Sequence, residues 1–456
     1  MYLSSKIMVL ILMNNSVNIE VLKFGGTSQK KSTYDMILNI INGKKDVKFI
    51  VVLSAIKGIT NKLLDFIESK NFSHWNTILE INKELSIETL NHENEFITSM
   101  INKLWNLESD KVELVSMGEF FTTNILNDYL KQNDIKSKFI SSYDVIKSNM
   151  NNNGNMYNKG EFTVDHKIIF EAFNNHQVII IPGFSGSSLD GSPCLLGRGG
   201  SDTTGSIIAA AVNASKYEIW TDVNGIYSCD PRIVENAYII KNIGYTASQE
   251  IAAMGAKVIH PYCILPCAEK NIPIVIKNTF EPDAKVNTTI SNNNGNESIY
   301  GITIQNNVKV FKITSMNMWN NFGFVYDIFS VFKKYNVDVN IINTSQFNIT
   351  TTTEESNIEN LMHVKNELEK KYNVELTFDI SIISVIGEKI RTYNQIGNLF
   401  NLTKNYPIIL TSYSSNDMTL SWVIKSNISN KLISSLHNLI SSDNKIKIMD
   451  FSNISY

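Results

Sequence analysis

The pattern of apolar and polar residues changes along the chain, and each pattern predicts a different architecture. In the first part, runs such as residues 49–53 and 178–181 are apolar without alternation, and helical stretches at 34–41 and 116–130 are interspersed with them. A strand that is apolar on both faces must be covered on both faces. The pattern therefore predicts an α/β fold, a three-layer αβα sandwich with a mostly parallel central sheet.

An asparagine-rich stretch near residues 292–296 marks a shift to short alternating strands and two-faced helices. The first set of elements is predicted as strands at 308–314, 337–344, 347–352 and 374–386, with helices at 323–335 and 358–372. A second set follows, with helices at 392–405 and 430–440 and strands at 408–412 and 418–424. The two sets indicate two βαββαβ units with weak internal repetition, which is an α+β ferredoxin-like arrangement.

These patterns define the expected domains. Residues 17–291 form the large α/β domain, 306–386 the first α+β unit and 387–456 the second, and the two units can be intertwined. Residues 1–16 are expected to be an N-terminal extension, because their apolar run is short for a signal peptide and no small-residue cleavage site follows it. The alternative is a start codon assigned too early, with Met13 as the true beginning.

Two local signals add detail to the large domain. An asparagine-rich stretch at residues 148–155 predicts a surface loop. Thr246 followed by Gln249 resembles a capping box, so we expect a helix to begin there and to carry Lys257.

Composition narrows the class of protein. A chain of 456 residues with 43% hydrophobic content is long and apolar enough for several domains, which suits a multidomain cytoplasmic enzyme. The net charge of -3 argues against a nucleic-acid partner, and no apolar run is long enough to span a membrane. The four cysteines show no disulfide framework, and His260, Cys263 and Cys267 lack zinc-site spacing. We expect packed or free thiols and no metal ligands from the protein.

The segment Lys23-Phe24-Gly25-Gly26-Thr27-Ser28 follows a predicted strand. Two adjacent glycines present bare N–H groups to an anion, while a lysine adds a point charge, so the segment suits phosphate binding. By itself a glycine pair after a strand is more often a turn.

A second glycine cluster, Gly197-Arg198-Gly199-Gly200-Ser201-Asp202, leads into a predicted buried helix at 203–212. The N-terminus of a helix attracts anions. Ser201 or Asp202 could instead serve only as the helix cap. Arg198 has a fork of donors that suits a carboxylate or a phosphate.

A third block, residues 219–232, reads as a strand end followed by a turn rich in Asp, Asn, Gly and Pro, which is typical of loops that line ligand clefts. The chain contains no P-loop, no protein-kinase glycine loop and no dinucleotide GxGxxG motif.

Together these blocks resemble the aspartate kinase (aspartokinase) family of the amino-acid kinase superfamily. Further similar stretches occur in the family's order at residues 51–55, 58–61, 116–119, 182–184 and 254–261. The resemblance implies a monofunctional enzyme of the lysine-sensitive type, an amino-acid kinase fold and two C-terminal ACT domains. The implied reaction transfers the γ-phosphoryl group of ATP, bound with Mg²⁺, to the side-chain carboxylate of L-aspartate.

The resemblance also assigns residues by their position. Lys23, Asp202 and Lys257 would be catalytic, with Asp202 orienting Lys23. The aspartate site would consist of Ser54, Thr60, Glu119, Arg198 and Ser201. The ATP site would consist of Lys23, Gly25, Gly26, Thr221, Asp222, Tyr227, Arg232 and Lys257.

Several of these residues have ordinary explanations. Glu119 could be a charge on a helix surface, Thr60 a helix cap and Lys257 a solvated lysine. For the whole chain the alternative is an amino-acid-binding regulatory protein with a decayed kinase domain, and within the kinases it is a glutamate 5-kinase. The retained charged residues and the ACT pair favour aspartate kinase.

The resemblance places regulation in the ACT domains, which in this family bind amino acids, commonly at dimer interfaces. It implies a homodimer or larger homo-oligomer, with L-lysine as a potential effector. The corresponding effector residues are Met318, Asn321, Gly323, Phe324, Val325, Val339, Asn340, Thr344, Ser345 and Gln346.

Two of these residues depart from the lysine-sensitive type. Asn340 and Gln346 replace an aspartate and a glutamate, so two charges that would face the ammonium groups of lysine are missing. We expect lysine inhibition to be weakened or lost, with the ACT pair kept chiefly for dimer assembly. The alternative is that Asp338 or backbone carbonyls take over and feedback survives.

Overall fold

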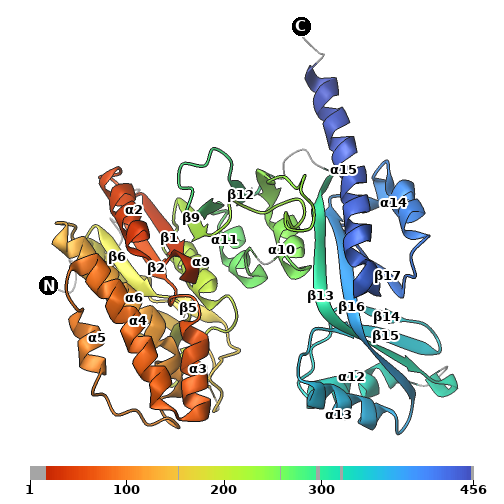
Figure 1. Ribbon diagram of the computed structural model, residues 1–456, viewed down its shortest axis with the longest axis horizontal. Helices are drawn as coiled ribbons and strands as arrows, with labels where there is room; N and C mark the ends of the chain where they lie inside the picture. Colours follow the sequence, from red (N-terminus) through yellow and green to blue (C-terminus); the bar gives the residue numbers. More distant parts are fainter. Residues whose placement is uncertain (1–16, 153, 257, 294–297, 319–321, 453–456) are drawn as a thin grey trace. The chain divides into compact units, whose positions relative to one another are not determined.

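The computed structural model describes residues 17–152, 154–256, 258–293, 298–318 and 322–452, which group into two compact units (Figure 1). The first unit contains the described residues up to Ile226, with Ile239–Gln249 and the segment 258–293. The second contains Tyr227–Tyr238, Glu250–Ala256 and the remaining C-terminal part. Among the described residues, no helix has both the length and the apolar character to cross a bilayer.

The first unit is organised around an eight-stranded sheet with the order β10-β12-β11-β9-β1-β2-β6-β3. Its neighbouring strands are parallel except for the antiparallel pair β11 and β12. The strands are β1 (Ile19–Phe24), β2 (Lys48–Leu53), β3 (Ser137–Phe139), β6 (Val178–Pro182), β9 (Lys216–Thr221), β10 (Asn242–Gly244), β11 (Ile274–Asn278) and β12 (Thr288–Ser291). The predicted mostly parallel sheet is confirmed.

Helices cover both faces of this sheet. One layer consists of α2 (Lys31–Asn42), α3 (Ile59–Ser69), α4 (Phe72–Leu90), α5 (Glu95–Met100) and α6 (Lys111–Gln132). Their apolar side chains form one continuous core with the strands, in which Phe24, Val51 and Ile180 are fully buried. Helix α9 (Gly200–Ala211) lies against β1, β2 and β9, and with α8 (His166–Phe173) and α11 (Leu265–Glu269) it completes the three layers.

A smaller sheet with the order β5-β4-β7-β8 extends the first unit. Its strands are β4 (Ile146–Ser148), β5 (Phe162–Val164), β7 (Ser185–Ser187) and β8 (Pro193–Leu195), and the short helix α7 (Ser142–Val145) precedes β4. Ser148 is the last residue of β4 and is buried, so the predicted surface loop starts one residue later than expected.

Helix α10 (Tyr245–Ala253) differs from its prediction. It begins one residue before Thr246, so Thr246 lies inside the helix and the predicted capping box is wrong. The helix also ends before position 257, which lies outside the described residues.

The second unit is built on a six-stranded antiparallel sheet with the order β14-β15-β13-β16-β18-β17. Its strands are β13 (Ile299–Thr314), β14 (Ile342–Thr344), β15 (Asn348–Thr353), β16 (Asn373–Gly387), β17 (Leu410–Tyr413) and β18 (Thr419–Lys425). Figure 1 shows β13 and β16 running the length of the sheet, through both of its halves. Helices α12 (Phe324–Lys334) and α13 (Ile358–Leu368) cover one half, and α14 (Ile396–Thr403) and α15 (Ser429–Ser452) cover the other.

The two halves correspond to the predicted pair of ferredoxin-like units, and they share β13 and β16. The register between these strands shifts between Gln305 and Val310, and Asn307 and Asp379 adopt left-handed backbone angles, with φ of 60° and 58°. The predicted strand at 337–344 shrinks to β14. Just before β14 the pairing with β15 becomes irregular: the N–H of Asn340 donates to the Thr352 carbonyl at 2.8 Å, whereas the N–H of Ile341 donates to the Thr352 hydroxyl at 2.9 Å.

All four cysteines are buried and free, as predicted for packed thiols. Cys194, Cys263 and Cys267 lie in the first unit, and Cys229 packs in the core beside α15.

Candidate functional site

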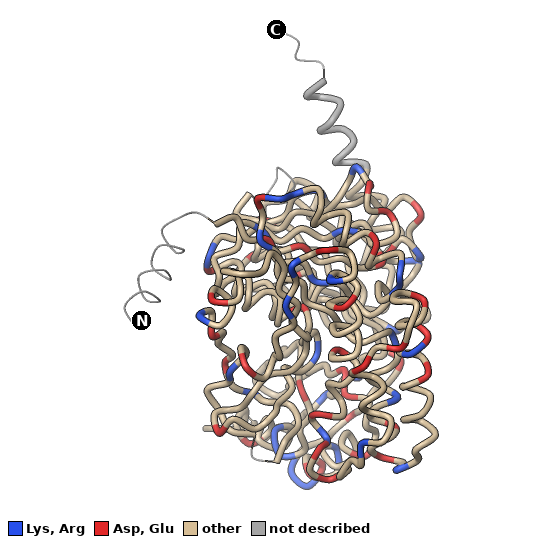
Figure 2. The backbone as a smooth tube through the Cα atoms, turned by 90° about the vertical axis from the view of Figure 1, so that its left-hand side faces the viewer, with Lys and Arg blue, Asp and Glu red and all other residues tan. Residues whose placement is uncertain are grey.

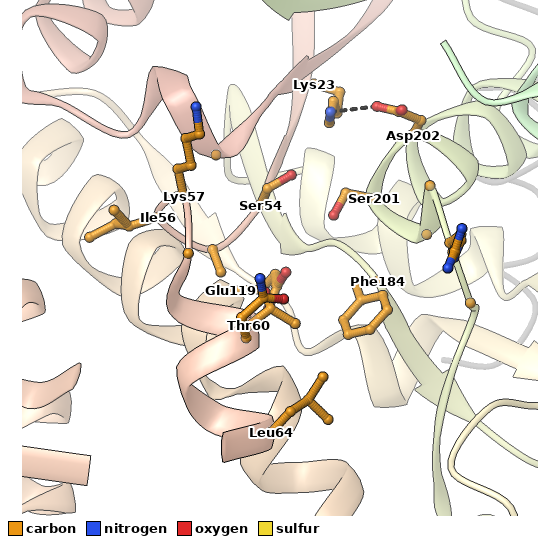
Figure 3. A pocket seen from close by; sticks show the side chains of 18 of the residues that line it. Lys23, Ser54, Ile56, Lys57, Thr60, Leu64, Glu119, Phe184, Ser201 and Asp202 are labelled. Atoms are coloured by element: carbon orange, nitrogen blue, oxygen red, sulfur yellow. Dashed lines mark ion pairs between the residues drawn. The ribbon is translucent and has the colours of Figure 1, made fainter. Parts of the chain in front are cut away.

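A cavity of about 400 Å³ lies where β1, β2 and β6 end, at the carboxyl edge of the parallel sheet (Figure 3). Ligands of open α/β sheets bind at this edge. The cavity is lined by Lys23, Gly26, Ser54, Ala55, Ile56, Lys57, Gly58, Thr60, Asn61, Leu64, Glu119, Tyr157, Phe184, Gly197, Arg198, Gly199, Gly200, Ser201 and Asp202. All five residues predicted for the aspartate site are therefore brought together.

The double glycine after β1 forms one wall through its backbone. A Cβ atom on Gly26 would lie 2.7 Å from the carbonyl oxygen of Ala55 and 3.2 Å from the nitrogen of Lys57. The N–H of Lys57 donates to the Gly26 carbonyl at 3.1 Å, and the N–H of Gly25 donates to the Trp220 carbonyl at 3.0 Å. Any side chain at position 26 would push these two loops apart.

Lys23 and Asp202 form an ion pair inside the cavity, with side chains that are only 10% and 15% exposed. Lys23 is the penultimate residue of β1, and Asp202 lies in the first turn of α9, where the helix dipole favours a negative charge. Helix α9 begins at Gly200 with Gly199 as its N-cap, so neither Ser201 nor Asp202 caps it. The structure thus brings Asp202 into contact with Lys23, and the role of Asp202 in orienting Lys23 stays a prediction.

Glu119 extends from α6 into the cavity and is 3% exposed, so it is not a surface charge. Burial raises the pKa of its carboxyl group to about 8, and the backbone N–H of Ala55, its own backbone N–H and the charge of Lys23 only partly offset the effect. Its Oε2 atom is buried and has no hydrogen-bond partner among the described residues. Such an oxygen is poised to accept a hydrogen bond from a ligand.

The remaining aspartate-site residues surround Glu119. Thr60 lies in the first turn of α3, whose N-cap is Gly58 with φ of 87°, so Thr60 is not a helix cap. Arg198 is exposed, and its guanidinium makes no hydrogen bond or ion pair with any residue the structure describes. Ser54 directly follows β2, and its N–H donates to the Phe24 carbonyl.

The predicted nucleotide residues are only partly gathered at this cavity. Lys23 and Gly26 line it, and the position of a Cβ on Gly25 would be 3.7 Å from Lys23 Nζ. Thr221 ends β9 and donates a hydrogen bond to Asp222 at 3.3 Å, and neither residue lines the cavity. Tyr227 and Arg232 fall in the segment that groups with the second unit, and Lys257 lies outside the described residues.

Sequence reasoning assigned no role to Lys57, Leu64 or Tyr157, which line the cavity. Tyr157 is far from the other lining residues in sequence, and its neighbourhood resembles low-complexity loop. The sequence could have pointed to Lys57, because it lies between 51–55 and 58–61, two stretches that resemble the aspartate kinase family. Phe184 was part of a similar stretch; it adopts a φ of 72°, and its N–H donates to the Thr204 hydroxyl at 3.1 Å.

Comparison with known proteins identifies the family. The chain matches the amino acid kinase family over residues 18–278. Aspartokinase 3, chloroplastic, of Arabidopsis thaliana is 30% identical over 441 residues, which cover 90% of this chain and 78% of the relative. The chain belongs to the aspartokinases. Lysine-sensitive aspartokinase 3 of Escherichia coli is 27% identical over 453 residues, which cover 92% and 98% of the two chains.

Solved structures agree with this assignment. E. coli aspartokinase III in complex with aspartate and ADP has a TM-score of 0.79 at 25% identity, with 92% of this aspartokinase and 99% of that chain covered. Clostridium acetobutylicum aspartate kinase has a TM-score of 0.71 at 25% identity. The predicted aspartate kinase is confirmed, and the decayed regulatory protein is not favoured.

The raised pKa of Glu119 predicts a pH-dependent stability for this aspartokinase. A carboxyl group whose pKa rises from 4.5 to about 8 on folding keeps its proton in the folded state after the unfolded chain has lost it. The unfolding free energy therefore falls progressively, and the folded state becomes less stable, as the pH rises from about 4.5 to about 8. Glu119→Gln removes this loss, so we expect its advantage over the wild type to grow between pH 5 and pH 8 without substrates.

Urea unfolding at a series of pH values measures this advantage. Glu113→Gln, at a half-exposed position of the same helix, controls for removal of a carboxyl group from α6. An advantage of Glu119→Gln that stays constant over the range would contradict the burial of an ionisable carboxyl.

Proposed function

We propose that this aspartokinase transfers the γ-phosphoryl group of ATP to the side-chain carboxylate of L-aspartate, giving 4-phospho-L-aspartate and ADP. This is the first step in making the aspartate-derived amino acids lysine, threonine and methionine. The observation that carries the proposal is the cavity itself, which combines an unpaired guanidinium, a buried carboxyl with an unpartnered oxygen and an ion-paired lysine beside a double glycine.

The groups around Arg198 and Glu119 complement the α-carbon end of aspartate. Arg198 can hold the α-carboxylate with two parallel hydrogen bonds, since its guanidinium is not engaged by any described residue. The unpartnered oxygen of Glu119 can accept a hydrogen bond from the α-ammonium, whose charge favours loss of the Glu119 proton. Ser54, Thr60 and Ser201 add neutral donors.

The other end of the cavity suits phosphate. A carboxylate oxygen of aspartate attacks the γ-phosphorus, the bond to the ADP oxygen breaks, and no proton needs to move. Catalysis then consists of positioning and charge neutralisation. Lys23, held by Asp202, provides the charge, and the backbone of Gly25 and Gly26 allows close approach. By resemblance, Thr221, Asp222, Tyr227, Arg232 and Lys257 complete the nucleotide site.

The donor set fits Mg²⁺ that arrives with ATP. Mg²⁺ is usually held by one or two carboxylates together with phosphate oxygens and water. Of the two carboxylates that line the cavity, Asp202 is paired with Lys23 and Glu119 is fully buried, so Asp202 is the side chain that could join its ligands. Bound Mg²⁺ would neutralise charge on the phosphates.

We also infer the domains given by the sequence, with the α/β domain at 17–291 and ACT units at 306–386 and 387–456 that are intertwined through β13 and β16. The four buried free cysteines suit a reducing compartment such as the cytoplasm. Cell fractionation with an antibody to the protein tests this location, and recovery outside the cytosolic fraction would contradict it.

Trapping of the acyl phosphate product with hydroxylamine tests the proposed reaction. We expect ATP-dependent formation of aspartyl hydroxamate with L-aspartate, and none with L-glutamate or N-acetyl-glutamate. Lys23→Ala should lower turnover by about 10² or more, because it removes a charge that stabilises the transferring phosphoryl group. The fold should survive, since the N-terminus of α9 still stabilises Asp202.

The exposed Lys30, which does not line the cavity, supplies the control variant Lys30→Ala. Near-normal turnover of a folded Lys23→Ala enzyme, verified by circular dichroism, would remove Lys23 from the phosphoryl-transfer machinery. Hydroxamate formation with glutamate as efficient as with aspartate would overturn the choice of substrate.

For assembly we propose a homodimer formed through the second unit. Within the described residues β14 is an edge strand of the sheet, and all three of its residues are exposed. Exposed apolar side chains of the same half include Val325, Tyr326 and Ile342. An edge strand offers unpaired N–H and C=O groups to a second copy of the chain.

Sedimentation at micromolar concentration should show a dimer, and Ile342→Lys should shift it towards monomer by placing a charge on the edge strand. Leu104→Lys, at a position of the first unit that is 92% exposed, should leave the dimer intact. A monomeric wild type, or equal behaviour of the two variants, would contradict assembly through β14.

For regulation we propose that lysine inhibition is weakened. Asn340 donates its side-chain amide to Glu354 at 3.0 Å, and Gln305 donates to the same oxygen at 3.0 Å. Asn340 therefore offers an effector only a neutral oxygen. Of the other effector residues, Gly323, Phe324 and Val325 lie at the start of α12, and Thr344, Ser345 and Gln346 lie at the β14 to β15 turn. Met318 is buried in the core under α12 and Val339 packs against it, while Asn321 lies outside the described residues.

Titration of activity with L-lysine, L-threonine and L-methionine measures this regulation. Losing a charge-assisted hydrogen bond costs about 1 kcal/mol, or roughly fivefold in affinity per site. The double variant Asn340→Asp with Gln346→Glu should therefore be inhibited at lower lysine concentrations than the wild type. Tight lysine inhibition of the wild type that the double variant does not improve would refute the idea.

A further inference from the structure

Lys57 is a charged residue of the cavity that the proposed mechanism leaves unused. Its side chain is exposed, and in the part of the chain that the structure describes its ammonium makes no ion pair and no hydrogen bond. Lys23, in contrast, is held by Asp202. An unengaged lysine on a cavity wall is free to bind an anionic ligand.

The backbone of Lys57 is fixed against the double glycine. Its N–H donates to the Gly26 carbonyl at 3.1 Å, and its Cα atom lies 3.3 Å from the place of a Cβ on Gly26. The next residue, Gly58, has a φ of 87° and is the N-cap of α3. The root of the Lys57 side chain is therefore anchored to the loop that we assign to the phosphates.

The direction of the side chain separates it from the amino-acid end of the cavity. Figure 3 shows Lys57 extending away from Thr60 and Glu119, toward the side of the cavity on which Lys23 lies. Figure 3 also places Lys57 and Asp202 on different sides of the cavity, and Asp202 pairs with Lys23 and not with Lys57.

The charges that line the cavity favour an anionic ligand. Three cationic side chains, Lys23, Lys57 and Arg198, line it together with two carboxylic side chains. Asp202 neutralises Lys23, and Arg198 is assigned to the α-carboxylate of aspartate. The positive charge that remains is that of Lys57, at the phosphate end.

We propose that Lys57 binds the terminal phosphate of ATP and positions it for transfer. The inference deepens the proposed function and rests on it, because the phosphate end is defined by the kinase reaction. Lys57 would contact the γ-phosphate from the side of the Gly26 loop while Lys23 contacts it from the side of α9. A point charge of this kind acts by proximity and needs no fixed fork of donors.

Calorimetric titration of the full-length enzyme with ADP and with the imido analogue of ATP, both with Mg²⁺ and without aspartate, tests the proposal. Lys57→Ala should weaken binding of the ATP analogue about tenfold and binding of ADP less than twofold. Lys57→Arg should restore most of the lost affinity, because it keeps the charge. In turnover, Lys57→Ala should raise the KM for ATP and leave the KM for aspartate unchanged.

Lys62→Ala is the matched control, since Lys62 lies on α3 five residues after Lys57, carries the same charge and does not line the cavity. Equal losses for ADP and the ATP analogue, or affinities of Lys57→Ala that equal those of Lys62→Ala, would overturn the proposal. These binding results do not depend on aspartate. A wild-type enzyme that binds the analogue through Lys57 but forms no aspartyl hydroxamate would instead refute the proposed reaction.

Discussion

The ion pair between Lys23 and Asp202 is the interaction on which the site depends. It joins the end of β1 to the first turn of α9, two elements whose sequence positions are far apart. A nearly buried charge pair is stable only when each partner compensates the other and further dipoles assist. Here the helix N-terminus stabilises the carboxylate, and Tyr217 fixes the same turn by donating its hydroxyl to the Asp202 carbonyl at 2.9 Å. The lysine is thereby held in place before any substrate binds.

A second constraint is the burial of the Glu119 carboxyl group away from solvent. Glu119 is surrounded by the packed side chains of α6, and Gly118 beside it has room for no Cβ, since that atom would lie 2.5 Å from the Cβ of Ala55. The helix can approach the loop after β2 only because position 118 is glycine. Close packing keeps the carboxyl group of Glu119 away from solvent, and the same burial strengthens its own charge interaction with a bound substrate.

Four of the five charged residues that line the cavity could be predicted from the sequence, whereas Lys57 and the spatial arrangement of the set could not. Motifs with local mechanisms, such as the double glycine and the Arg198 cluster, predicted residues that the structure brings to one cavity, because backbone and charge chemistry are encoded within a few residues. Tyr157 was missed since it reaches the cavity through the smaller sheet, where an isolated bridge pairs it with Leu195. The layers of the fold followed from apolar runs, but α3, α4 and α5 were not foreseen. Helix α4 has buried residues around much of its surface, including Asn82 and Ser86, so its polar and apolar positions do not separate cleanly in sequence.

The strands that both halves of the second unit share limit how this unit can evolve. Because β13 and β16 each supply hydrogen bonds to both halves, neither half is a detachable module. Deleting the chain after β16 would strip β16 of its partner β18 and uncover Ile383 and Val385, which are fully buried. The two halves can therefore be lost or exchanged in evolution only together. A substitution in β13 or β16 must be compatible with the packing of both halves.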